Sequence, residues 1–227
     1  MNNPSFCNRT AFDLFVSEIG QIESDAGICN AATAIAMHFD PLVCPQRVAL
    51  KLDDIANQVT SRVVSGSSRA MTAHLHHVLF DEIGFRANTE NFFDQKNSFL
   101  PSVLEYQCGI PITLALVYKL VAGRCGLVVN GLNTPGHFLA RLTFENESMI
   151  VDCFSGGKLL SEDEVIARGM KMTREGSMAE SAVIEVATHR QWVARILANL
   201  IHTFTLENRR DDIAAVSELY DVLKLAY

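Results

Sequence analysis

The stretch that decides the fold of this chain is GIPITLALVYKLVAGRCG, residues 109–126. No charge occurs from Ile112 to Tyr118, and apolar residues cover every face of the helix that this segment would form, which indicates a fully buried helix. Pro111 suits the first helical turn, because its fixed φ fits and the N–H it lacks would be unpaired there. The sequence therefore predicts a central buried helix that ends near Cys125-Gly126.

Three short segments typical of strands follow this helix. They are residues 127–132, 138–144 and 149–154. The polar turn at 145–148 separates the last two as a hairpin. A buried helix packed on a small antiparallel sheet is an α+β layer architecture, and this is the predicted core.

The first hundred residues favour helices. Apolar residues recur at helical spacing in several segments, as Phe12, Phe15 and Ile19 do in the first. Gly84 is placed to close the last of these helices as a C-terminal glycine. The expected helices cover residues 11–19, 26–37, 47–64 and 69–83.

The C-terminal part predicts a helical hairpin. Residues 176–181 are small and polar and form the best candidate linker. Thr188 followed by Gln191 is typical of a capping box at a helix start. A break at 208–211 separates this helix from a second amphipathic one, which gives an αα-hairpin. The predicted domains are residues 1–175, a helical region plus the core, and residues 182–227.

Composition narrows the class of protein. The 227 residues are 48% hydrophobic and carry a formal net charge of −7, with scattered Lys and Arg, so we expect one well-filled core and no nucleic-acid partner. The N-terminus lacks a signal-peptide pattern, and the longest apolar run is too short for a bilayer. We therefore expect a cytoplasmic protein without a membrane partner. Six cysteines without a CxxC pair are expected to be free thiols.

Two further patterns favour structural interpretations. His74, His76 and His77 invite a metal site, but only His74 and His77 share a helix face and no third ligand has suitable spacing. We expect His76 on the exposed side. Gly156-Gly157 predicts a tight turn, because no helix with the residues of a phosphate-binding loop follows it. Neither a metal nor a cofactor is expected.

His137 and Asp152 carry the main chemical signal. His137 follows Pro135-Gly136, and Asp152 comes fifteen residues later on a neighbouring predicted strand. Such a pair forms the base and the orienting group of a Cys-His-Asp nucleophilic site. Two structural alternatives to this site stay open. In the first, His137 is an ordinary turn histidine. In the second, Asp152 caps the turn that contains Ser155.

Several spaced motifs together resemble a transglutaminase-like core, and most closely the SirB-type bacterial transglutaminase-like proteins. The resemblance covers residues 70–170, and agreement of separate motifs makes it specific. It implies a papain-like core with a helical N-terminal region and tetratricopeptide-like helices after the core. The matching segments are HVLFDEIGF at 77–85, NSFL at 97–100, GIPITL at 109–114, PGHFL at 135–139 and DCFSGG at 152–157.

The resemblance assigns roles and also reveals departures. It makes His137 the general base and Asp152 the group that fixes its tautomer. The nucleophilic Cys of active relatives stands two residues after the helix-start glycine, where this chain has Pro111. Leu139 stands where active relatives usually have Trp, and Cys153 replaces the usual Pro after the Asp.

Four residues could replace the missing nucleophile. Cys125 lies at the far end of the helix, about 21 Å from Pro111 at 1.5 Å per residue. Strand alternation directs Cys153 away from the side of Asp152, and Thr113 lies about 200° round the helix from Pro111. Cys108 is the remaining candidate, because a thiol before a helix N-terminus is favoured as the thiolate.

The sequence leads to three functional hypotheses. The first is a non-catalytic binding or regulatory protein with a protein or peptide partner and a cleft at Gly109, Pro111, Pro135 and Gly136. The second is a cysteine hydrolase or acyltransferase that uses Cys108 with His137 and Asp152. The third is a helical interaction scaffold in which residues 189–226 bind a partner.

Overall fold

The buried helix of the sequence analysis is α6, Pro111–Arg124, in the computed structural model, which describes residues 3–64, 66–144, 147–167 and 184–225. Every residue from Pro111 to Ala122 is buried. Pro111 occupies the first helical position, and Gly126 adopts a left-handed φ of +78° just after the helix. The prediction of a fully buried helix is confirmed.

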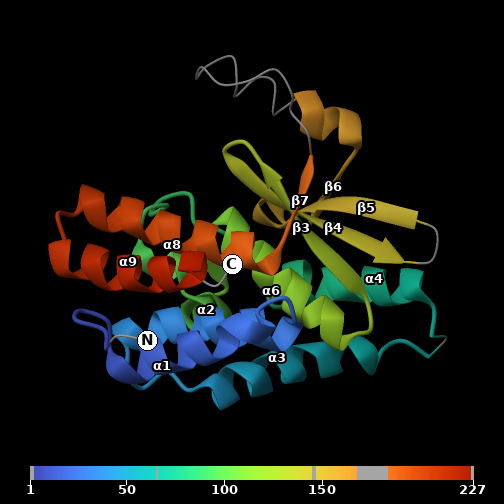
Figure 1. The fold of residues 1–227 in the computed structure, drawn as a ribbon. Helices are drawn as coiled ribbons and strands as arrows, with labels where there is room; N and C mark the ends of the chain where they lie inside the picture. The colour runs from blue at the N-terminus through green and yellow to red at the C-terminus, as the bar shows by residue number, and fades with distance from the viewer. Residues whose placement is uncertain (1–2, 65, 145–146, 168–183, 226–227) are drawn as a thin grey trace. The chain divides into compact units, whose positions relative to one another are not determined.

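A five-stranded antiparallel sheet accompanies α6, which packs against β3 and β4 (Figure 1). The central strands match the three predicted segments, so the combination of helices with a small antiparallel sheet is confirmed. The two three-residue edge strands were not predicted. In spatial order the strands are β6 (Lys158–Leu160), β5 (Glu147–Asp152), β4 (His137–Phe144), β3 (Val128–Thr134) and β7 (Glu185–Ala187).

The chain groups into two compact units. One consists of residues 52–87 and 107–187 and contains α6 and the sheet. The other consists of residues 1–51, 88–106 and 188–227 and is helical where the structure describes it. The division into residues 1–175 and 182–227 stays a prediction, and its linker at 176–181 lies outside the described residues.

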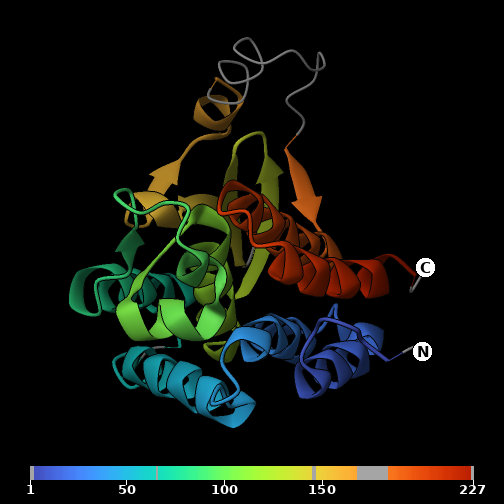
Figure 2. The ribbon, with the colours of Figure 1, turned by 90° about the vertical axis from the view of Figure 1, so that its left-hand side faces the viewer.

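The helical unit is built around α2, which packs against α1, α5 and α8. The Phe39 ring near the end of α2 stacks on Phe99 at 4.9 Å and lies 5.2 Å from Phe204. Helices α8 and α9 form the predicted hairpin, shown in red in Figure 2. The helices with residues in this unit are α1 (Arg9–Glu18), α2 (Asp25–Phe39), α3 (Pro45–Thr60), α5 (Leu100–Tyr106), α8 (His189–Leu206) and α9 (Arg210–Leu225), with short 3-10 turns at Ile19–Gln21 and Gln95–Ser98.

The helix predicted for residues 69–83 changes its geometry midway. Helix α4 covers Ser68–His76, and a π-helix follows over His77–Glu82, where the Ile83 N–H donates to the Val78 carbonyl. Gly84 then adopts φ +80°, as expected of a closing glycine. A short strand β1 (Arg86–Ala87) pairs in parallel with β2 (Cys108–Gly109) directly before α6.

The predicted capping box at Thr188 is present and gives a testable contribution to stability. The Thr188 hydroxyl accepts from the Gln191 N–H at 3.1 Å, and the Gln191 side chain accepts from the Thr188 N–H at 2.9 Å. We expect Thr188→Ala to lower the free energy of unfolding by about 1 kcal/mol in urea titrations followed by circular dichroism. Thr205→Ala, near the other end of α8, removes a hydroxyl bonded only to the preceding turn and should change it by less than about 0.5 kcal/mol. Equal losses in the two variants would contradict a capping role.

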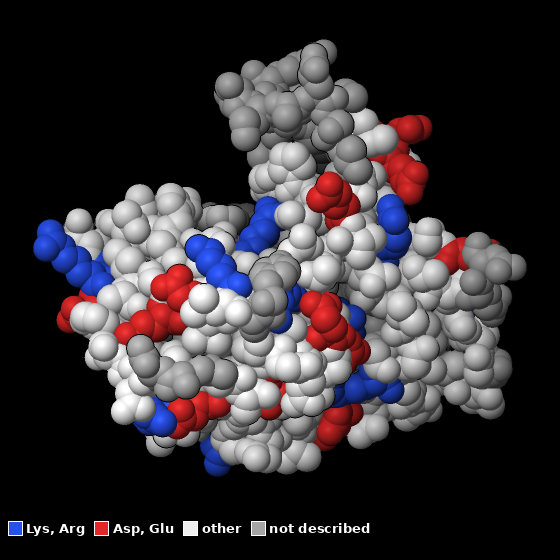
Figure 3. Space-filling view, viewed as in Figure 1, with Lys and Arg blue, Asp and Glu red and all other residues white. Residues whose placement is uncertain are grey.

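Helix hydropathy and surface charge are the two properties that bear on contact with a membrane or a nucleic acid. Within the described part of the chain, no helix is both long and apolar enough to cross a membrane. On the face shown in Figure 3, Lys and Arg are interspersed with Asp and Glu.

Candidate functional site

The turn between β3 and β4 positions His137 at the start of β4. Pro135 and Gly136 are exposed at this turn, and Gly136 takes a left-handed φ of +66°. Thr134 pairs with His137 across the turn, and its hydroxyl donates to the His137 carbonyl at 2.9 Å. This arrangement fixes the backbone of His137, whose side chain is 26% exposed. The imidazole is therefore accessible from a rigid hairpin end.

The strand register explains why Asp152 reaches His137. Ala140 lies opposite Val151, so Asp152 at the end of β5 is a diagonal neighbour of His137. The His137 Nε2 lies 2.9 Å from Asp152 Oδ1, and the Asp152 side chain is only 1% exposed. The structure thus brings together the two residues that the sequence singled out, with Nδ1 as the second ring nitrogen.

Asp152 also caps the turn that follows it, in addition to its contact with His137. Its carboxylate accepts from the Ser155 N–H at 3.2 Å and from the Ser155 hydroxyl at 2.8 Å. Burial raises the pKa of Asp152, but the hydrogen bond and charge of His137 and the two Ser155 bonds outweigh it and lower that pKa to about 2. Asp152 is therefore a fixed buried anion beside the His137 ring.

Tight packing holds the turn after Asp152. Gly156 and Gly157 have φ of +67° and +77°, which confirms the predicted glycine turn. A Cβ at Gly157 would overlap the ring of Phe80. The Phe154 ring also contacts His137 edge to face, with centroids 6.0 Å apart. The acid and its imidazole partner therefore lie in a closely packed corner.

The residues before α6 lie beside this corner. Cys108 and Gly109 pair through β2 with β1, and β1 packs against residues Cys153–Ser155, as α6 does. Gly109 and Pro111 are buried, whereas Cys108 is partly exposed. Of the four predicted cleft residues, Pro135 and Gly136 are exposed, whereas Gly109 and Pro111 are buried. The assignment of all four to a cleft stays a prediction.

The other candidate nucleophiles are unsuited to attack. Cys153 is fully buried, and burial together with the nearby Asp152 raises its pKa well above the usual range. Cys125 caps the far end of α6, and burial raises its pKa to about 11. The Thr113 hydroxyl is buried and donates to the Ile110 carbonyl at 3.2 Å. All three would resist forming the required anion.

His76 is placed differently from expectation. We expected it on the exposed side, but it is half-buried, and its Nε2 lies 2.8 Å from the Tyr118 hydroxyl on α6. Burial lowers the pKa of His76, with Asp81 opposing the shift. His77 is the exposed one and contacts Asp81 and Glu82.

The sequence did contain a signal for the Tyr118 contact. Tyr118 is 1% exposed, and a buried tyrosine hydroxyl needs a hydrogen-bonding partner. Burial and the neighbouring Cys153 raise the pKa of Tyr118 well above its usual value, so the hydroxyl stays protonated. No group of three or more His, Cys, Asp or Glu side chains suited to a metal occurs among the described residues.

Comparisons with known proteins relate this geometry to a family. The model of the transglutaminase-like superfamily matches residues 46–198. A UPF0162 protein of Xylella fastidiosa strain 9a5c is 33% identical over 158 residues, which are 67% of this chain and 55% of that protein. A UPF0162 protein of Pseudomonas aeruginosa is 25% identical over 198 residues, 86% of this chain and 71% of that protein.

Another relative is the human F-box only protein 21, which is 25% identical over 133 residues, 56% of this chain and 20% of that protein. The chain spans about half the length of the Xylella relatives it matches. No solved structure matches it. Since the family model covers well over half of the sequence, including His137 and Asp152, the chain belongs to the transglutaminase-like superfamily.

Proposed function

We propose that this protein is a non-catalytic, SirB-type member of its superfamily that binds a peptide with its His137–Asp152 corner and so acts as a regulatory protein. One observation carries the proposal. The His137–Asp152 pair is bonded, while the position of the family's nucleophile is occupied by Pro111, the first residue of a buried helix. Proline has no group that could attack a substrate.

The chemistry of the corner suits recognition of a peptide oxygen. Asp152 remains ionised and forms a hydrogen bond with the imidazole Nε2, while the ring stays partly exposed. The partly exposed ring can then contact a carbonyl or carboxylate oxygen of the peptide. The exposed Pro135-Gly136 turn lies directly before His137 and would contact the peptide next to that oxygen.

Binding should depend on His137. A positional-scanning peptide library screened by fluorescence polarisation would identify ligands of the whole protein. We expect His137→Ala to weaken binding of these peptides about tenfold, equivalent to about 1.4 kcal/mol. His202→Ala, which removes an exposed imidazole from α8, is the matched control and should bind as the unmodified protein does. Unchanged affinity in His137→Ala would refute the proposal and leave the 189–226 hairpin as the next candidate surface.

The alternative function is an enzyme that uses Cys108 as its nucleophile. This alternative can be tested because Cys108 is partly exposed and lies beside the α6 N-terminus. A Cys–His ion pair keeps a thiol reactive at low pH. We expect iodoacetamide at pH 5.5 to alkylate Cys108 at the same slow rate in the unmodified protein and in His137→Ala. Peptide mass spectrometry would measure this rate. Rapid alkylation that depends on His137, accompanied by release of ammonia from glutamine peptides, would replace the binding proposal with a cysteine acyltransferase.

We place the activity in the cytoplasm, as part of this proposal. All six cysteines are free thiols, which is the usual state of cysteines in a reducing compartment. The α8–α9 hairpin is proposed to be the tetratricopeptide-like element of the SirB-type arrangement.

A further inference from the structure

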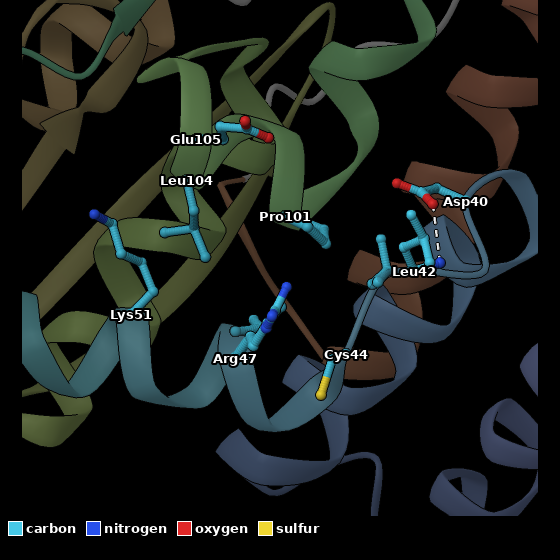
Figure 4. Close-up of a pocket in the computed structure, with 10 residues that line it drawn as sticks. Asp40, Leu42, Cys44, Arg47, Lys51, Pro101, Leu104 and Glu105 are labelled. Carbon is cyan, nitrogen blue, oxygen red and sulfur yellow. Dashed lines mark hydrogen bonds between the residues drawn. The ribbon is translucent and has the colours of Figure 1, made fainter.

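A second possible binding site lies in the helical unit, and it does not depend on the proposed function of His137. A pocket of about 430 Å³ opens between the loop after α2, the first turns of α3 and helix α5 (Figure 4). This volume lies in the range of small-molecule sites, roughly 300–1,000 Å³. All its lining residues belong to one compact unit, so the pocket is formed within that unit alone.

The walls of the pocket are largely apolar. Val48 on α3 and Leu104 on α5 are 4% and 3% exposed and form its buried base. Leu42, at the rim, is 84% exposed, which is unusual for a leucine beside a cavity. A ligand with an apolar body would cover Leu42 and contact the other two side chains. The gain from removing apolar surface from water favours such a ligand.

The same pocket contains two cations. Arg47 and Lys51 are one turn apart on α3, and both are exposed. Like charges at this helical spacing repel each other, so the pair is unfavourable until an anion approaches. Neither side chain forms an ion pair within the described ranges of the chain. In Figure 4 the Arg47 guanidinium points into the pocket toward Pro101.

Two carboxylates, Asp40 and Glu105, also line the pocket. Asp40 lies at one edge, where its Oδ1 accepts from the Leu42 N–H at 2.9 Å and fixes the loop. Glu105 lies at another edge, on α5 (Figure 4). The pocket therefore combines an apolar base with the inward-directed Arg47 guanidinium, and Lys51, Asp40 and Glu105 lie around it (Figure 4).

We propose that this pocket binds a small amphiphilic anion, with a carboxylate or phosphate head at Arg47 and Lys51 and an apolar tail over Leu42, Val48 and Leu104. Both heads offer oxygens to a guanidinium and an ammonium group, so they share the same recognition chemistry. The two cations would set the orientation, and the apolar walls would select a molecule with a hydrocarbon part over inorganic phosphate or acetate.

Calorimetric titration of the full chain with octanoate and, separately, with octyl phosphate tests this site. Octyl glucoside is the uncharged control and acetate the control without a tail. We expect at least one of the two anions to bind and both controls to fail. We expect the double variant Arg47→Gln/Lys51→Gln to bind about tenfold more weakly, because it loses the charge-assisted bonds. The anion that binds more tightly identifies the preferred head group.

A charge-matched variant separates the site from general electrostatics. Lys158→Gln/Arg210→Gln removes two exposed cations elsewhere and should bind as the unmodified protein does. A diazirine-bearing alkyl carboxylate should form photoadducts within residues 40–51 and 101–105, mapped by peptide mass spectrometry. Equal binding of octyl glucoside, equal weakening in the two double variants, or no binding of either anion at millimolar concentration would overturn the proposal.

Discussion

Gly27→Ala should destabilise this protein by about 3 kcal/mol, although the same exchange in an ordinary helix interior stabilises by about 1 kcal/mol. Gly27 lies in the first turn of α2, where its N–H donates to the Ser24 hydroxyl at 2.9 Å. A Cβ there would overlap the carbonyl oxygen of Gln21, and would lie 2.7 Å from the Gln21 carbonyl carbon and 3.0 Å from the Ile22 Cα. These are backbone atoms, so no side-chain rotation relieves the overlap.

The measurement is urea unfolding followed by circular dichroism. The midpoint temperature of thermal unfolding should also fall, by roughly 6–12 °C for a chain of this size. Gly20→Ala is the matched control. Gly20 precedes the same turn, is exposed, and has no atom within 4 Å of an added Cβ. It should be neutral or slightly stabilising, since alanine restricts the unfolded chain. If both variants gained stability, the close approach of the α1–α2 turn to Gly27 would be wrong.

The long amphipathic helices could be predicted because each carries its own signal. Thr188 and Gln191 indicate where the helix over residues 189–206 starts, and the capping box is present as predicted. The fully apolar run after Pro111 admits only a buried helix. Such signals are local, so they indicate a helix without any knowledge of its tertiary contacts.

The edges of the sheet could not be predicted for the opposite reason. Strand β7 has three residues and pairs with residues 131–133, more than fifty positions earlier in the chain. Three residues are too few to show an alternation of apolar and polar side chains. Their pairing is decided by the partner strand, which no local pattern reveals.

The exposure of His76 illustrates a different limit. Thr72, four residues before it, and Leu79, three residues after it, are both buried, so helical spacing alone would place His76 inward. The Tyr118 hydroxyl, which lies on a distant helix, satisfies the imidazole and makes its partial burial acceptable.

The pairing of His137 with Asp152 could be predicted from the sequence, but the groups that surround the pair could not. The spacing of His137 and Asp152 reflects a hairpin whose register sets them diagonally across two strands. From the sequence, a cap on the turn that contains Ser155 is an alternative to that pair. The structure shows one carboxylate in both interactions, because Oδ1 contacts His137 Nε2 and also accepts from the Ser155 N–H, while Oδ2 accepts from the Ser155 hydroxyl.

Asp152→Asn should lower the free energy of unfolding at pH 7 by about 2 kcal/mol, and the difference should vanish in acid. The pKa of Asp152 is about 2 in the folded protein, against an ordinary value of 3.8. The folded state therefore holds the ionised form more strongly than the unfolded state does. This stabilisation is complete above the unfolded pKa and is lost as the pH falls from about 5 toward 2.

Urea titrations between pH 7 and pH 2.5 would give the two stability curves, which should converge as the pH decreases. Asparagine keeps the shape of the side chain and can still accept a hydrogen bond, so the variant tests the charge more than the packing. Asp54→Asn, on the exposed side of α3, is the control, and its curve should remain parallel to that of the unmodified protein. A difference between Asp152→Asn and the unmodified protein that stays constant across this range would mean that His137 and Ser155 do not stabilise the carboxylate charge. In that case the corner would lack the fixed anion on which recognition by the imidazole depends.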